Sequence, residues 1–150
     1  MGQSLSKIYT HLVFATKGRA EILPKEHLNE VHAYIAETLN KNGCKAIAVG
    51  GTANHIHILY IQSKTMSLSE TVRVVKSCSS KWINEHTSCL SFFCWQDGYG
   101  AFSISNSHVD DVVRYIQNQL EHHKRVSFED EFRKICAKYN VALDERYAWE

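Results

Sequence analysis

Apolar residues recur every three or four positions in two segments of the first half of the chain, as they do on the buried face of an α-helix. Pro24 suits the first turn of one such helix, and Gly43 is a typical residue at its C-terminal end. A second helix is expected over residues 68–86, because Ser67 and Glu70 have the spacing of a capping box. The pattern therefore predicts two amphipathic helices in this half.

Two further helices are expected in the second half of the chain. Ser107, with Asp110 three residues later, indicates the start of the first, and Ser127 and Asp130 indicate the start of the second. The second of these helices should end near Asn140. The apolar stripe of the helix after Ser107 consists of Val109, Val112, Val113, Ile116 and Leu120.

Runs rich in β-branched and aromatic residues predict five strands, at residues 5–16, 45–49, 55–61, 92–95 and 99–104. Asp97-Gly98, between the last two, is a strong signal for a tight hairpin. The resulting order, β-α-β-β-α-β-β-α-α, predicts an α+β fold: a ferredoxin/RRM-like antiparallel sheet with helices packed on one face. Because no repeat or linker interrupts this order, we expect residues 1–150 to form a single domain.

Composition and charge agree with a globular domain and add one detail. The 150 residues are 44% hydrophobic and 22% charged. No apolar run approaches the ~20 residues of a membrane span and the N-terminus does not resemble a signal peptide, so a cytoplasmic protein without membrane contact is expected. The net charge is only +1, but ten basic and five acidic side chains give residues 1–81 a net charge of +5. This half can present a positive face to nucleic acid.

The five cysteines are odd in number and include no CxxC pair. Reduced, buried thiols of a cytosolic protein explain them best. Cys89 and Cys94 could join a histidine in a zinc site, but their spacing is poor for that geometry.

His55 and His57 are the first candidate chemical groups, on the expected strand 55–61. Alternate residues of a strand share a face, so both imidazoles can reach one cation while Ile56 points to the core. The alternative is a pair of surface histidines on a half-buried strand, and a lone His-x-His pattern does not decide between the two.

Tyr115 and Gln119 form the second candidate pair. They are four residues apart on the helix after Ser107 and therefore project from one face. The amide oxygen of Gln119 can bind a hard cation, and the hydroxyl of Tyr115 can act as a covalent nucleophile when a metal or a base assists it. A half-buried aromatic beside the apolar stripe is the plainer interpretation of Tyr115 taken alone.

Basic side chains on the helix 68–86 are the third candidate group. Arg73, Lys76 and Lys81 lie off its apolar stripe, among several serines. Such side chains suit contacts with phosphate groups. They are equally compatible with an ordinary solvated helix face.

Taken in order, these segments resemble the single-tyrosine HUH transposases of single-strand insertion sequences and the related REP-associated tyrosine transposases. HUH stands for histidine–hydrophobe–histidine, and the similarity runs nearly from end to end. One departure precedes the first histidine, where this chain has Ala53-Asn54 and family members often carry Pro-Asp. The similar segments are Tyr9–Lys17, His55–His57, Val75–Ser77 with Trp82, Trp95-Gln96, Gly98–Ser103, Tyr115-Ile116 with Gln119, His122-His123, and Asp144–Trp149.

The resemblance implies the HUH endonuclease fold and a mechanism. His55, His57 and Gln119 would hold a divalent metal ion, Mg²⁺ or Mn²⁺, over the scissile phosphate of single-stranded DNA. Tyr115 would attack the phosphorus and form a 5′-phosphotyrosine with a free 3′-hydroxyl. Because the covalent link conserves the phosphodiester energy, the strand could be rejoined without ATP.

The resemblance also implies partners. The family recognises hairpin DNA near the ends of the element, and Arg73, Lys76 and Lys81 are the candidates for backbone contacts here. Rejoining two DNA ends needs two nucleophiles, so a homodimer with one Tyr115 in each chain is the simplest active unit. In the family the tyrosine helix of one subunit commonly completes the metal site of the other, which predicts active sites shared between subunits.

Two alternatives of other classes remain open. The first is a domesticated, non-catalytic module that binds single-stranded nucleic acid, although the intact set of His55, His57, Tyr115 and Gln119 argues against it. The second is a metal phosphodiesterase that uses water and leaves no covalent adduct. A phosphoesterase with two histidine motifs is disfavoured, because no second His-x-Ser/Thr strand is present.

Overall fold

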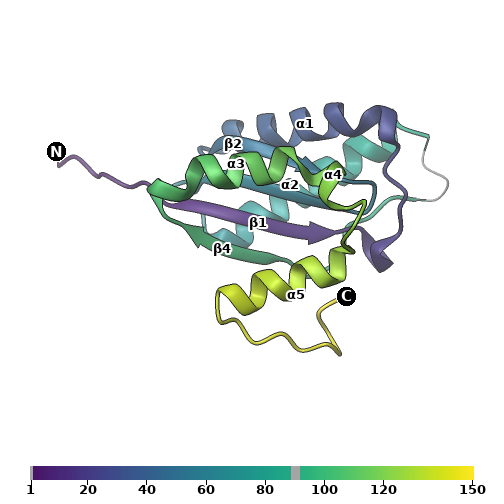
Figure 1. Cartoon of the computed structure of the whole chain (residues 1–150). Helices are drawn as coiled ribbons and strands as arrows, with labels where there is room; N and C mark the ends of the chain where they lie inside the picture. The colour runs from purple at the N-terminus through teal and green to yellow at the C-terminus, as the bar shows by residue number, and fades with distance from the viewer. Residues whose placement is uncertain (1, 89–91) are drawn as a thin grey trace.

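The computed structural model describes residues 2–88 and 92–150 and centres on a four-stranded antiparallel sheet (Figure 1). The strands are β1 (Tyr9–Ala15), β2 (Lys45–Gly51), β3 (His55–Ile61) and β4 (Gly100–Ile104), in the spatial order β2-β3-β1-β4. The two central strands, β1 and β3, are paired along their whole length. Their middle residues are therefore the best-fixed positions on the sheet.

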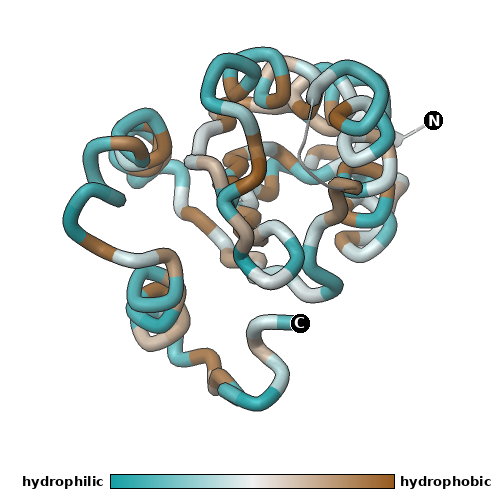
Figure 2. The backbone as a smooth tube through the Cα atoms, turned by 90° about the vertical axis from the view of Figure 1, so that its right-hand side faces the viewer, coloured by the Kyte–Doolittle hydropathy of each residue, from teal (hydrophilic) through white to brown (hydrophobic). Residues whose placement is uncertain are grey.

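Helices cover both faces of this sheet. α1 (Leu28–Lys41) and α2 (Leu68–His86) pack on one face. α3 (Val109–Gln117), α4 (Gln119–His122) and α5 (Phe128–Lys138) lie over the other. Figure 2 views the same arrangement from the side, with helices on either side of the strands.

The predicted α+β class with an antiparallel sheet is confirmed. The prediction of helices on one face describes α1 and α2, and the structure adds α3, α4 and α5 on the second face. The physical reason lies in β1, where all seven residues are buried. A strand buried on both sides needs cover on both sides.

The helix ends follow the capping signals in two of three cases. The Ser67 hydroxyl accepts a hydrogen bond from the Glu70 backbone N–H at 3.1 Å, and Ser127 does the same for Asp130 at 3.2 Å. Ser107 instead lies in a short 3₁₀ turn ahead of α3. The predicted helix after it is broken at Asn118, and Leu120 is 56% exposed rather than part of a buried stripe.

The predicted strand at residues 92–95 and its hairpin with the next strand are wrong. Only Trp95 forms a β-bridge, with Thr16, and β4 pairs with β1. The residues of the expected turn bind elsewhere: the Gly98 N–H donates to the Glu150 carbonyl, and the Lys76 ammonium donates to the carbonyls of Gln96, Asp97 and Gly98. Tertiary contacts thus replace the hairpin.

Two remaining expectations concern single features. Cys94 is a free thiol. Cys89, the second cysteine of the possible zinc site, lies outside the described residues. Across residues 2–88 and 92–150, no helix is long and apolar enough to cross a membrane.

Candidate active site

The two histidines of β3 lie on the face of the sheet under α3, α4 and α5. Strand alternation places Ile56 and Ile58 in the apolar core under α1 and α2, and it turns His55 and His57 the other way. Both histidines are fully buried, which excludes the alternative of a surface pair. His11 of β1 joins them, with its Nε2 2.8 Å from His57 Nδ1.

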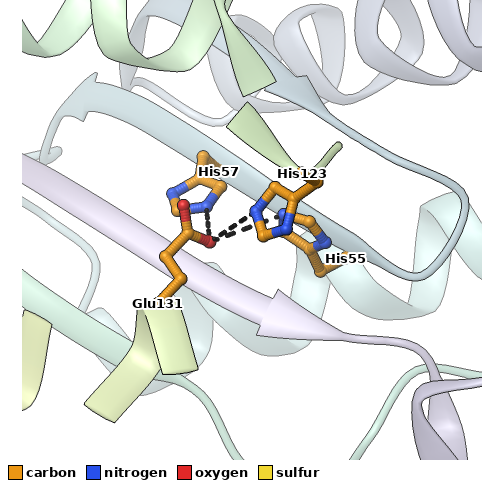
Figure 3. A group of neighbouring side chains, drawn as sticks. All are labelled: His55, His57, His123 and Glu131. Carbon is orange, nitrogen blue, oxygen red and sulfur yellow. Dashed lines mark hydrogen bonds and ion pairs between the residues drawn. The ribbon is translucent and has the colours of Figure 1, made fainter. Parts of the chain in front are cut away.

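A glutamate from α5 reaches into this histidine cluster. Glu131 is 2% exposed, and its Oε1 lies 2.9 Å from His57 Nε2 and 3.0 Å from His123 Nε2 (Figure 3). The same oxygen lies 3.6 Å from His55 Nε2. The other oxygen, Oε2, lies 3.3 Å from His122 Nε2. One carboxylate therefore meets four imidazoles, two from β3 and two from the end of α4.

This group has the donor set of a metal site. His55, His57, His123 and Glu131 can each offer one ligand atom, and these atoms all lie within 4.8 Å of one another. Imidazole nitrogen and carboxylate oxygen are common ligands of divalent transition metals. The described residues therefore fit a divalent cation at this place.

Gln119, at the start of α4, touches the same cluster. Its side chain is 1% exposed, with Oε1 2.8 Å from His55 Nε2 and Nε2 donating to Glu131 Oε2 at 2.9 Å. On the far side of the His55 ring, Nδ1 lies 2.8 Å from Asn54 Oδ1. Asn54 thus offers an oxygen that fixes the orientation of this imidazole, as the outer partners of ligating histidines commonly do.

Tyr115 of α3 completes the arrangement. Its hydroxyl donates a hydrogen bond to Glu131 Oε2, and its ring centroid lies 5.6 Å from that of His57. The four predicted site residues, His55, His57, Gln119 and Tyr115, therefore come together within one chain.

Burial sets the ionisation of the cluster. It lowers the pKa of His55 to about 3 and that of His11 to about 3, so both imidazoles are neutral, the form that binds metals. Burial alone would raise the pKa of Glu131, but hydrogen bonds from His123 and His57 outweigh it and hold this pKa well below its usual range. Burial and the hydrogen bond to Glu131 raise the pKa of the Tyr115 phenol, which is therefore protonated at neutral pH.

The predicted DNA-contacting residues lie elsewhere, on α2 across the sheet. Arg73 pairs with Glu70, and Lys81 is exposed to solvent. Lys76 is tied to three backbone carbonyls, and burial lowers the pKa of its ammonium to about 8. The structure does not bring these three side chains near Tyr115.

A hollow of about 930 Å³ opens beside the histidine cluster. Asn54 and His123 contribute to its wall. His123 is the cluster member that meets this hollow, since His55 and His57 have no exposed surface. The hollow is therefore the side from which a small ion could reach the buried ligands.

Sequence reasoning missed Glu131 and His11 and gave His123 no role of its own. Acidic residues are common in the first turn of a helix because they complement the helix dipole. A functional glutamate at such a position, like Glu131, is therefore hard to recognise from sequence. The position of Glu131 on its helix could have identified it. Helical spacing puts Glu131 on the same side of α5 as Phe128 and Ile135, and a carboxylate is unusual on such an apolar face.

Comparisons with known proteins agree with this fold and indicate a family. The family model described as Transposase IS200 like matches residues 4–119. No curated protein matches the chain. A solved structure of a candidate transposase from Deinococcus radiodurans R1 is 20% identical with a TM-score of 0.60, covering 79% of this chain and 96% of its own.

A second similar structure is a REP-associated tyrosine transposase bound to a REP hairpin. It is 15% identical with a TM-score of 0.61, covering 84% of this chain and 76% of its own. At these identities the two structures support the fold alone. The family match spans most of the sequence, including His55, His57, Tyr115 and Gln119, so the chain belongs to the IS200-like transposase family.

Proposed function

We propose that this chain is a metal-dependent single-stranded DNA transposase that cleaves and rejoins strands through a 5′-phosphotyrosine. One observation carries the proposal: the hydroxyl of Tyr115 lies in the same buried cluster as His55 and His57. A tyrosine hydroxyl beside a set of metal ligands can act as a nucleophile that a bound metal ion assists.

The chain's own residues supply most of the chemistry. His55, His57, His123 and Glu131 offer ligand atoms that lie within 4.8 Å of one another, and Gln119 adds an amide oxygen beside His55. A divalent cation, Mg²⁺ or Mn²⁺, supplies when bound the positive charge that stabilises the transition state at phosphorus. Tyr115 Oη loses its proton and bonds to the phosphorus as the bond from phosphorus to the 3′-oxygen of the upstream nucleotide breaks. The 3′-oxygen takes up a proton, so the net change in protons is zero, and the reverse reaction rejoins a strand.

The substrate proposed is single-stranded DNA that carries a hairpin. Support comes from the family match and from the similar structure that is described as bound to a REP hairpin. Arg73, Lys76 and Lys81 remain the candidates for backbone contacts; Arg73 and Lys81 are exposed, whereas Lys76 is half-buried. Action on DNA is also the reason to propose a cytoplasmic location.

We further propose one domain over residues 1–150, because α5, beyond the matched residues, brings Glu131 to the site. A homodimer remains the simplest unit that offers two nucleophiles to two DNA ends. Active sites shared between subunits, as the family resemblance implies, would replace the contact that Tyr115 makes with Glu131 of its own chain. Mixing Tyr115→Phe with His57→Ala protein under subunit exchange tests this: shared sites would restore cleavage, and separate sites would not.

The experiment for the function uses a panel of single-stranded hairpin oligonucleotides, labelled at the 5′ or the 3′ end, with Mn²⁺ or with EDTA. A band that migrates as a covalent protein–DNA complex on a denaturing gel, present only with Mn²⁺, is the expected result. Cleavage without any such band would identify a phosphodiesterase that uses water. Hairpin binding without cleavage would identify a non-catalytic binding module.

A further inference from the structure

We propose that Glu131 is a positioning residue, which holds the phenol of Tyr115 and the amide of Gln119 against the histidine pair. The inference rests on the proposed function, in which Tyr115 is the nucleophile. It assigns a task to α5, which lies outside residues 4–119 and so outside the part of the chain that the family model matches.

The two oxygens of Glu131 face different partners. Oε1 is directed to two imidazoles, 2.9 Å from His57 Nε2 and 3.0 Å from His123 Nε2. Oε2 accepts hydrogen bonds from the Tyr115 hydroxyl and, at 2.9 Å, from the Gln119 amide, and it also lies 3.3 Å from His122 Nε2. A single rigid carboxylate thus connects the candidate metal ligands with the candidate nucleophile.

The position of Tyr115 at the end of a helix explains why a restraint by Glu131 would matter. Tyr115 lies near the end of α3, and Gln119 begins α4 after the break at Asn118. The continuous helix that would fix their relative orientation is therefore absent at this point of the described chain. Because a nucleophile must be held close to its target, a side chain that restrains both residues can accelerate attack substantially.

The burial of Glu131 indicates that it does more than pack α5 onto the sheet. A carboxylate with 2% exposure loses much of its hydration, and it is tolerated because several donors surround it. An apolar residue would dock the helix without that requirement. The neighbours of Glu131 on α5, Phe128 and Phe132, already supply apolar contacts with the sheet.

The first test needs neither metal nor DNA. The seven tyrosines can be replaced by 3-fluorotyrosine and followed by ¹⁹F NMR, with Tyr115→Phe assigning the Tyr115 resonance. Glu131→Gln should move or broaden this resonance and leave the others in place. Glu85→Gln, at an exposed glutamate on α2, should move none of them.

The second test separates positioning from metal binding. At saturating Mn²⁺ and hairpin DNA, single-turnover adduct formation should slow by about 10–100-fold in Glu131→Gln, with hairpin affinity within about twofold of wild type. Glu131→Asp, which keeps the charge on a shorter side chain, should recover part of the rate. Circular dichroism and thermal unfolding verify that both variants are folded.

Three results would overturn the proposal. An unmoved Tyr115 resonance in Glu131→Gln would do so, and so would an unchanged rate. A rate that returns to the wild-type value once Mn²⁺ is saturating would make Glu131 a ligand without a positioning role. If wild-type protein forms no adduct at all, the proposed function fails, whereas the ¹⁹F measurement still reports on the contact between Glu131 and Tyr115.

Discussion

The two faces of the central sheet use the same strands for opposite purposes. Under α1 and α2, β1 and β3 contribute Leu12, Phe14, Ile56 and Ile58 to a continuous apolar core. Under α3, α4 and α5, the neighbouring positions of the same strands include buried histidines. Side-chain alternation along a strand lets one segment, His55-Ile56-His57, serve stability on one side and chemistry on the other.

The two faces should respond differently to mutation. On the apolar face, a truncation leaves a cavity, and the loss follows the volume removed. On the polar face, a truncation leaves a partner without its hydrogen bond. In the described part of the chain every buried side-chain nitrogen and oxygen has such a partner, so each loss there creates an unsatisfied group.

The largest effect on activity is expected from His57→Ala. Removal of a ligand should weaken Mn²⁺ binding by more than tenfold, since even outer partners contribute about 10–100-fold, and adduct formation should fall below detection. His57 is buried between His11 and Glu131, so the free energy of unfolding should also fall, by about 1–3 kcal/mol. Calorimetric Mn²⁺ titration and urea unfolding measure the two effects. Wild-type Mn²⁺ affinity in the folded variant would remove His57 from the ligand set.

The largest effect on stability is expected from Ile58→Ala, one residue along the same strand. Ile58 is fully buried in the apolar core, so the free energy of unfolding should fall by about 2–5 kcal/mol. Mn²⁺ affinity and the adduct rate of the folded fraction should stay within about twofold of wild type. If Ile58→Ala weakened Mn²⁺ binding as much as His57→Ala, the two faces would not be separable.

The polar face should also make the metal-free protein sensitive to acid. The pKa of His11 and of His55 is held at about 3, whereas these histidines titrate near 6.5 in the unfolded chain. The unfolded state therefore binds more protons between these values, and stability falls as the pH falls below 6.5. The loss between pH 6.5 and pH 5 should be on the order of 2 kcal/mol for each histidine that stays neutral. Urea unfolding at several pH values checks this, and a constant free energy of unfolding over that interval would contradict it.

The smallest effects are expected from the basic residues of α2. Lys81→Ala should lower hairpin affinity a few-fold, reduce its salt dependence by about one unit, and change stability by less than about 0.5 kcal/mol. Lys76→Ala should instead lower stability by about 1–2 kcal/mol, because it removes donors to three carbonyls. Filter binding at several salt concentrations separates the two. Equal hairpin affinity in Lys81→Ala and wild type would remove Lys81 from the DNA contacts.

The features that depend on short sequence patterns, such as helix caps and side-chain alternation along a strand, were predictable from the sequence. The Ser67 cap sets the start of α2, and the alternation around Ile56 sets which way His55 and His57 point. The spacing of Tyr115 and Gln119 brought them to one side even though the helix breaks between them. Each of these features depends on residues within a few positions of one another.

The remainder depends on contacts between distant segments. Glu131 contacts His57, which lies 74 positions away in the sequence, and no local sequence pattern near either residue predicts this contact. The expected hairpin at Asp97-Gly98 fails for a similar reason, because Lys76 and Glu150 bind its backbone. Cover of the second face by α5 was likewise hidden, since the total burial of β1 is a property of the assembled fold.

The central claim is that the polar face of the sheet is a metal-dependent site whose nucleophile is Tyr115. The most direct measurement is mass spectrometry of peptides from protein that has reacted with hairpin DNA and Mn²⁺. The wild type should yield a DNA-linked peptide that contains Tyr115. Tyr115→Phe, a variant that loses one oxygen and should still bind the hairpin, should yield none. A DNA-linked peptide in that variant, for instance one that contains Tyr99 beside α2, would contradict this expectation, because a residue other than Tyr115 would then be the nucleophile.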